Sequence, residues 1–154
     1  MKMIQKKKVS KYIALFLCFV LSSPVCVNAA GIEDNPVMPA ASIYLDSYQG
    51  YVYPAGSGEI QVWFDVTGVD YMDELGALSI WLYESTDNTT WTQVEYFHYL
   101  DNPGMLKYNA ISNMNHVTYQ GIVGRYYRAR ICIWGGKDGE GDSRYLWTSP
   151  KKAT

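Results

Sequence analysis

The sequence predicts an all-β domain, and the main reason is a two-fold alternation of apolar and polar residues from Ser42 onward. Gly, Pro, Asn and Asp interrupt the alternation at short intervals, as turns between strands do. Thirteen of the 14 tyrosines and all five tryptophans follow residue 29, and aromatic side chains fit half-buried pleated surfaces. No segment of this region has the apolar period of a helix. We therefore expect strands joined by short connections.

The clearest strands lie in the first half of the domain. In residues 59–66 apolar side chains alternate with a mixed set, and residues 78–83 repeat the pattern. Residues 68–77, between them, carry three acidic side chains and are expected to form a connection. Residues 84–89 have the composition of a polar turn, and a further strand is expected at residues 91–99.

The second half of the domain begins with a strong turn signal, Asp-Asn-Pro-Gly at residues 101–104. A segment of weak alternation follows, and the next strand is expected at residues 116–120. Residues 135–143 are rich in glycine and aspartate, which predicts a loop before a last strand at residues 144–149.

The run from residue 126 to residue 134 is a strand with two possible registers. One register buries Arg128 and Arg130 without visible partners, which costs several kcal/mol, about 2–7 for even a neutral polar group. We therefore expect the other register, which points Tyr127, Ala129, Ile131 and Ile133 inward and Arg128, Arg130, Cys132 and Trp134 outward.

With residues 43–48 as the first, these segments make seven expected strands. That number and the short connections between strands are typical of an immunoglobulin-like β-sandwich. We expect a seven-stranded antiparallel sandwich over residues 42–150, followed by a short tail at residues 151–154.

Two resemblances agree with this fold. Gly124, Tyr127, Ala129 and Ile131 resemble the sixth strand of fibronectin type III domains, where a tyrosine near the strand start locks the corner by hydrogen bonding. Over residues 42–149 the chain also resembles a family of small secreted proteins of unknown function from bacteria of the Gram-positive type. This resemblance implies the sandwich fold and no particular activity. It rests on Met72-Asp73-Glu74-Leu75-Gly76-Ala77, on Glu84-Ser85-Thr86-Asp87 leading to Trp91, and on Tyr119-Gln120-Gly121 with Gly124 and residues 126–129.

Residues 1–29 have the layout of a secretory signal peptide. Five lysines precede an unbroken apolar run from Ile13 to Leu21. Small residues end the segment, which places the expected cleavage between Ala29 and Ala30. The apolar run is shorter than the roughly 18 residues that a membrane span needs. The alternative is lipid attachment at Cys26. Residues 30–41 are expected to be a flexible leader. Because of the signal peptide, we expect the mature protein to be secreted, and association with the cell surface is the alternative.

Charge and cysteine content exclude some classes of partner. Five of the 13 basic residues and none of the 15 acidic residues lie in residues 1–29, which leaves 8 against 15 and a net charge of −7 for residues 30–154. Nucleic acids and anionic membranes select clusters of Lys and Arg, so neither is an expected partner. Only Cys132 remains in the mature chain; no internal disulfide is possible there.

Catalytic and metal sites have little support in the sequence. His98 and His116 have no metal-type partner at a recognisable spacing, and no nucleophile motif is present. Asp138, Glu140 and Asp142 alternate with glycines and are weak candidates for a calcium site, although such loops are ordinary turn chemistry. We expect no cofactor and no catalytic residues; a small secreted hydrolase or lyase is the alternative.

The strongest candidate site is an outward face that combines aromatic rings with guanidinium groups. Such a face suits recognition of a glycan, a cell-wall component or a protein. Arginines between cross-strand aromatics also form ladders that only stabilise a sheet. We therefore expect a non-enzymatic extracellular binding module, with a structural or assembly role through a free strand edge as a further alternative. The expected binding residues are Trp81, Tyr83, Arg128, Arg130, Trp134, Tyr145 and Trp147.

Overall fold

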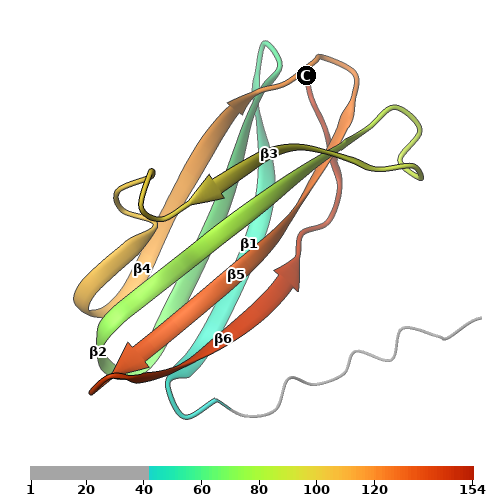
Figure 1. The fold of residues 1–154 in the computed structure, drawn as a ribbon. Helices are drawn as coiled ribbons and strands as arrows, with labels where there is room; N and C mark the ends of the chain where they lie inside the picture. The colour runs from blue at the N-terminus through green and yellow to red at the C-terminus, as the bar shows by residue number, and fades with distance from the viewer. Residues whose placement is uncertain (1–41) are drawn as a thin grey trace, which may run out of the picture. The chain divides into compact units, whose positions relative to one another are not determined.

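The computed structural model describes residues 42–154, and all regular structure in this part of the chain is β-strand (Figure 1), which confirms the all-β prediction. The expected signal peptide and leader lie outside the described residues. In the described part no helix is long and apolar enough to cross a membrane. The strands are β1 (Leu45–Gly56), β2 (Glu59–Ser85), β3 (Thr92–His98), β4 (Leu106–Gln120), β5 (Tyr126–Lys137), β6 (Glu140–Trp147) and β7 (Lys151–Lys152).

Strand β2 is 27 residues long and joins two segments that the sequence divides into separate strands. The expected connection at residues 68–77 is wrong, because this segment continues the strand and buries Met72, Leu75 and Ala77. Its acidic side chains, which indicated a loop, occupy exposed or half-buried positions along the strand. Shifts in the pairing register on both sides of this segment bend the strand there.

The strands form one antiparallel sheet that curls, because β2 pairs with different neighbours along its length. Its first half lies between β1 and β4, and its second half lies between β3 and β5. Strand β6 extends the sheet beyond β5, and β7 pairs with the start of β5. The number of strands agrees with the prediction, but they are not the same seven, because β2 unites two of them and β7 is additional.

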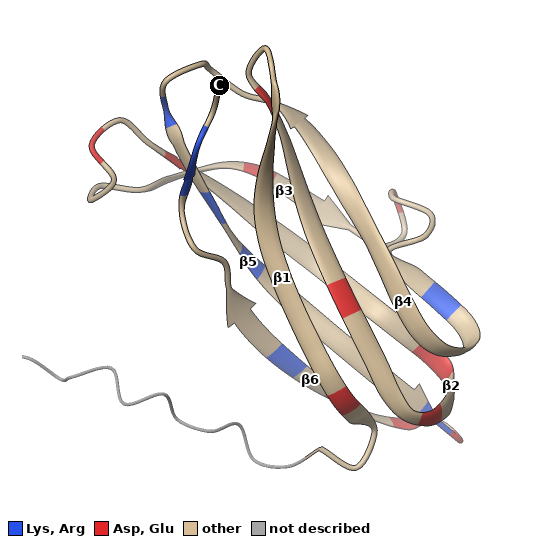
Figure 2. Ribbon diagram, turned by 180° about the vertical axis from the view of Figure 1, so that it is seen from behind, with Lys and Arg blue, Asp and Glu red and all other residues tan. Residues whose placement is uncertain are grey.

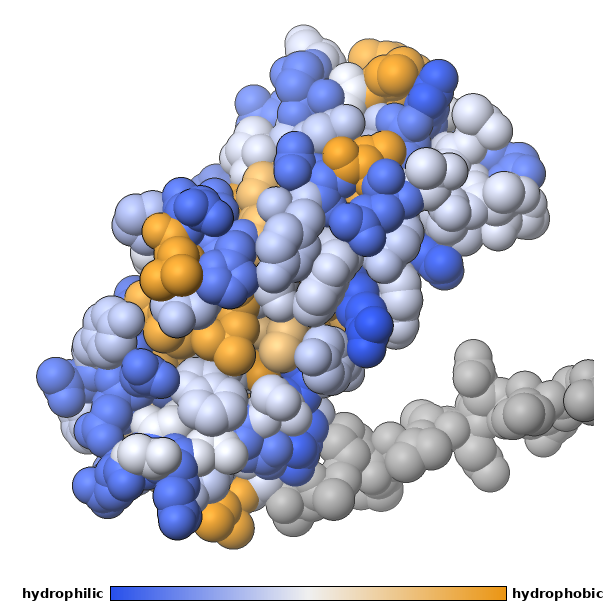
Figure 3. Space-filling model, in the orientation of Figure 1, coloured by the Kyte–Doolittle hydropathy of each residue, from blue (hydrophilic) through white to orange (hydrophobic). Residues whose placement is uncertain are grey.

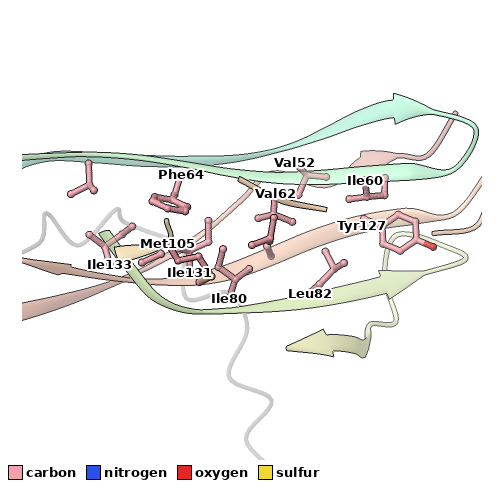
Figure 4. Packing of buried hydrophobic residues seen from close by; sticks show 14 of the residues in the cluster. Val52, Ile60, Val62, Phe64, Ile80, Leu82, Met105, Tyr127, Ile131 and Ile133 are labelled. Carbon is pink, nitrogen blue, oxygen red and sulfur yellow. The ribbon is translucent and has the colours of Figure 1, made fainter. Parts of the chain in front are cut away.

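The hydrophobic core lies between the two halves of the curled sheet, and Figure 4 shows side chains from both halves pointing toward one another. Burying one large apolar side chain stabilises a fold by about 1.5–3 kcal/mol. The expected register of residues 126–134 is confirmed for its inward set. Fully buried are Ile60, Val62 and Phe64 from the first half, and Ile80, Leu82, Tyr127, Ala129, Ile131 and Ile133 from the second.

Strand β4 begins at Leu106 rather than at the expected His116. Its alternation is weak because an inward position holds Asn113, which is fully buried. The Asn113 side-chain amide donates to the carbonyl oxygens of Leu75 (3.0 Å) and Met105 (3.2 Å). The amide nitrogen of this buried side chain therefore has main-chain partners, which a hydrophobicity pattern does not reveal.

The expected loop at residues 135–143 is also wrong, because these residues form the end of β5 and the start of β6. The two strands are joined by a two-residue turn at Asp138 (φ 56°) and Gly139 (φ 80°). Positive φ at both central positions is characteristic of the type I′ turn, which Asp-Gly favours.

Tyr127 closes one end of the core. Its hydroxyl accepts a hydrogen bond from the Ile122 N–H (2.8 Å) and donates one to the Glu84 carboxylate. Glu84 also forms an ion pair with Arg125. These bonds tie the start of β5 to the loop before it and to the end of β2. The C-terminal residues pack beside this loop, since the N–H of the buried Ala153 donates to the Arg125 carbonyl (2.8 Å).

Asp87 holds the turn after β2 and gives a prediction on pH dependence. Its carboxylate accepts the N–H groups of Thr90 and Thr89, both at 2.8 Å, and these bonds hold the pKa of Asp87 well below its usual value. A lowered pKa stabilises the fold above the unfolded-state pKa of about 3.9, and this contribution is lost as pH falls through the folded-state pKa.

We therefore expect Asp87→Asn to lower the Tm at neutral pH, and the difference from wild type to shrink below about pH 4. Thermal unfolding followed by circular dichroism at a series of pH values measures both curves. A Tm difference that stays constant down to the lowest pH would contradict the assignment of the stabilisation to the ionised carboxylate.

Candidate functional site

The outward side chains of the second half of the sheet form one surface across four strands. β3, the second half of β2, β5 and β6 lie side by side on the near side of Figure 1. Cross-strand pairing places Trp81 opposite both Tyr96 and Arg130, and Arg130 opposite Trp147. We define the aromatic–arginine face as Trp81, Tyr83, Trp91, Tyr96, Arg128, Arg130, Tyr145 and Trp147.

Arg128 lies between two tryptophans. Its guanidinium carbon is 4.3 Å from the ring centroid of Trp91 and 4.7 Å from that of Trp147. Tyr83 packs beside Trp147, with 5.2 Å between ring centroids. The Nε atom of Arg128 is buried and has no hydrogen-bond partner among residues 42–154. Two tryptophan contacts and a buried Nε atom support a structural role for Arg128 in this face. Each cation–π contact contributes about 0.5–2 kcal/mol.

Arg130 lies over two other rings of the face. Its guanidinium carbon is 4.4 Å from the ring centroid of Tyr145 and 5.7 Å from that of Trp81. Tyr145 and Trp147 remain 54% and 52% exposed. In the described part of the chain no carboxylate forms an ion pair with either arginine of this face. The face therefore presents cationic hydrogen-bond donors among flat rings, without a carboxylate in ion-pair contact.

Cys132 was expected to face outward, but it is buried at 4% exposure although it lies in the outward row of β5. Tyr145 pairs opposite it and covers the thiol. Burial raises the pKa of the Cys132 thiol, and the hydrogen bond with Tyr145 opposes this change only in part. The thiol is thus protonated at neutral pH, which makes it a poor nucleophile.

Trp134 does not join the aromatic–arginine face. Its indole N–H donates to Glu74 Oε2 (3.0 Å), and its ring packs on Gly136 and Gly141, where an added Cβ would come within 3 Å of the ring. It lines a separate open pocket at the far end of β5, together with Asp73, Glu74, Tyr108 and Glu140. Trp134 thus points outward, as alternation predicts. Its neighbours are residues of this pocket and not those of the aromatic–arginine face.

Two members of the face were missed by the sequence reasoning. Trp91 stacks on Arg128, and Tyr96 packs against Trp81 with 5.4 Å between ring centroids. The strand that carries Tyr96 was expected, but alternation does not say which strand edge it pairs with. The signal available was composition, since two aromatics at the start and middle of one strand favour a sheet surface.

Two of the three weak calcium candidates use their carboxylates in other interactions. Tyr44 donates to Glu140 Oε2 (3.2 Å), and Asp142 pairs with Arg144. The main-chain N–H of Asp138 donates to Asp73 Oδ2 (2.7 Å). Within residues 42–154, no three His, Cys, Asp or Glu side chains are grouped so that they hold a metal ion.

The two histidines lie on different faces and each packs against an aromatic ring. His116 stacks on Trp63 with 4.3 Å between ring centroids, and His98 lies 4.7 Å from the Tyr99 ring. Neither therefore joins a nucleophile or a carboxylate in a catalytic arrangement among the described residues.

The chain matches no protein-family model, no curated protein and no solved structure.

Proposed function

We propose that the protein is a non-enzymatic binding module that acts outside the cell, and that its aromatic–arginine face binds a glycan carrying carboxylate groups. The observation that carries the proposal is Arg130, which lies beside Trp81 and Tyr145 and has no carboxylate partner among the described residues. Arginine binds carboxylates through two parallel charge-assisted hydrogen bonds.

The charge distribution supports an anionic ligand. The chain after residue 29 carries 15 acidic and 8 basic residues, yet this face holds two arginines without paired carboxylates. An unpaired cation on an otherwise acidic domain attracts negative charge locally, and the domain's net charge repels highly charged polymers such as nucleic acids. A glycan with at most one carboxylate per sugar has a lower charge density than a nucleic-acid duplex, which carries one charge per about 1.7 Å, and so satisfies both conditions.

The aromatic part of the face supports a sugar as the rest of the ligand. Tyr96, Tyr145 and Trp147 are 45%, 54% and 52% exposed, so large rings are available without a deep pocket. Figure 3 shows this side of the domain as a mixed surface, with hydrophobic residues interspersed among hydrophilic ones. Such a surface suits a ligand that combines flat apolar patches with many hydroxyl groups.

The structural and binding interpretations of the face assign different roles to its two arginines. Arg128 lies within 4.7 Å of the centroids of two tryptophan rings and has a buried Nε atom, which supports a role in stabilising the sheet. Arg130 is the binding residue in this proposal. A single surface can thus be both a stabilising ladder and a recognition site.

Export and fold relationship complete the proposal. The signal-like residues 1–29 support secretion of the chain from residue 30. Membership of a secreted bacterial family of fibronectin type III-like or immunoglobulin-like sandwiches is supported by two observations. The halves of the curled sheet face each other across one core, and the Tyr127 hydroxyl bonds to the chain just before its strand.

The test is binding of purified residues 30–154 to polygalacturonate and to a neutral glucan of similar length, measured by calorimetry. We expect polygalacturonate to bind more tightly than the neutral glucan. We expect Arg130→Gln to weaken binding at least about tenfold, because a hydrogen bond to a charged group contributes about 1.5–3 kcal/mol. Trp147→Ala should weaken the binding as well, through the loss of ring area.

The matched control is Tyr53→Ala, which removes an exposed ring from β1, on the other half of the sheet. It should bind polygalacturonate as wild type does. Equal binding of Arg130→Gln and wild type would show that the face is only a structural ladder.

A further inference from the structure

The outer edge of β4 has no main-chain partner in the described part of the chain. β4 pairs only with β2, and beyond it no strand continues the sheet (Figure 2). Side chains of β4 hold the turn that precedes it, since the Asn113 and Asn115 amides donate to the Gly104 carbonyl. The N–H and C=O groups along this edge are therefore a template for another strand.

The other free edges carry features that oppose pairing. β1 contains Pro54 and has a register shift near each end. β3 is only seven residues long, contains Glu95 and pairs with β2 through a register shift. β6 carries Glu140, Asp142 and Arg144. Prolines, charges, bulges and short length are the usual means by which edge strands avoid edge-to-edge association.

β4 lacks these features over most of its length. Residues 108–120 contain no charged residue, no proline and no glycine. From Ser112 to Gln120 the strand pairs with β2 at nine consecutive positions without a shift, so the outer edge is regular there. Met114 is 54% exposed on this stretch. The His116 N–H donates locally to Asn115 Oδ1 (2.8 Å), a bond that a partner strand has to displace.

We propose that the outer edge of β4 pairs with β4 of a second copy of this chain, so that two sheets become continuous across a two-fold axis. Antiparallel pairing of identical strands places each residue opposite another of the same uncharged stretch, so no like charges meet directly. The net charge of −7 on residues 30–154 repels the copies at longer range. The association is therefore weak and strengthens with salt.

A second copy fits this edge better than the chain's own N-terminal segment. Residues 30–41 contain Pro36 and Pro39, which lack the N–H that a ladder needs. Self-pairing also leaves the aromatic–arginine face open, because β4 belongs to the half of the sheet that contains β1. Two such faces in one dimer would raise the apparent affinity for a polymeric ligand without a new contact. This inference does not depend on the proposed glycan function.

The test is sedimentation equilibrium of residues 30–154 over a range of protein and salt concentrations. We expect the weight-average mass of wild type to rise with concentration toward that of two chains. Met114→Lys with Thr118→Lys places two charges on exposed positions of β4, and this variant should keep the mass of one chain throughout. Thr92→Lys with Gln93→Lys places the same charge on exposed positions of β3 and should associate as wild type does.

Hydrogen exchange gives a second measurement that needs no variant. Amides of residues 112–120 should exchange more slowly as the wild-type concentration rises, while those of β3 should not change. A wild type that keeps the mass of one chain at every concentration would overturn the proposal. So would a dimer that the β4 variant forms equally well, or one without concentration-dependent protection of β4.

Discussion

Replacing Gly76 by alanine is expected to cost more than about 3 kcal/mol of folding free energy, or to prevent folding, because neighbouring main chain fills the space a Cβ needs. A Cβ on Gly76 would lie 2.0 Å from the Met105 carbonyl oxygen and 2.7 Å from Asn113 Nδ2. Met105 cannot move away freely, because its carbonyl accepts both the Ala77 N–H (2.8 Å) and the Asn113 amide (3.2 Å). The substitution thus breaks buried hydrogen bonds at the point where β2 bends.

Gly56→Ala is the matched control for this prediction. Gly56 also has a positive φ (98°), but an added Cβ there meets no atom within 4 Å. Its cost is expected to be only the left-handed backbone penalty, roughly 1–2 kcal/mol. Urea unfolding of both variants separates steric exclusion from backbone strain. Equal costs at the two positions would contradict the close approach at Gly76.

The sequence was sufficient to predict an all-β domain because alternation reports local burial directly. It gave the inward set of residues 126–134, since the alternative required burying arginines. It failed at residues 68–77, where acidic side chains indicated a loop although they occupy outward positions of a bent, continuous β2. Whether such a segment leaves the sheet depends on its neighbours, and β4 and β5 pair with it on its two sides.

For the candidate site, too, the sequence predicts the direction of the side chains but not which of them lie together. Alternation identified which side chains of β2, β5 and β6 point outward, and pairing in the structure brings most of them together. Trp91 and Tyr96 were missed because their position depends on the edge at which β3 pairs. Trp134 lies apart from the others, because alternation gives the direction of a side chain and not the residues beside it on neighbouring strands. Its indole N–H instead bonds to Glu74, at the bend of β2.

Tyr127→Phe is expected to destabilise the fold by about 1–3 kcal/mol at neutral pH, because it removes one hydroxyl that makes two partly buried hydrogen bonds, one of them to a carboxylate. The change leaves the Ile122 N–H without its acceptor and the Glu84 carboxylate without one of its donors. Volume is nearly unchanged, so the loss reports hydrogen bonding and not packing. Urea unfolding at pH 7 measures it, and Tyr53→Phe, which alters an exposed tyrosine, should change stability by less than about 0.5 kcal/mol.

The same pair of proteins should converge at alkaline pH. Burial, followed by the hydrogen bond to Glu84, raises the pKa of Tyr127 to about 12, against about 10 for a tyrosine in the unfolded chain. Because the pKa is higher in the folded chain, the Tyr127 hydroxyl contributes its full stabilisation of the fold below pH 10. This stabilisation, roughly 2–3 kcal/mol, is lost as the pH rises toward 12. The phenylalanine variant lacks this ionisation. Its stability should therefore fall less steeply, and the wild-type advantage should vanish near pH 12. Parallel curves for the two proteins would mean that the Tyr127 hydroxyl ionises equally easily in the folded and unfolded chain, and so is not held in the buried bond to Glu84.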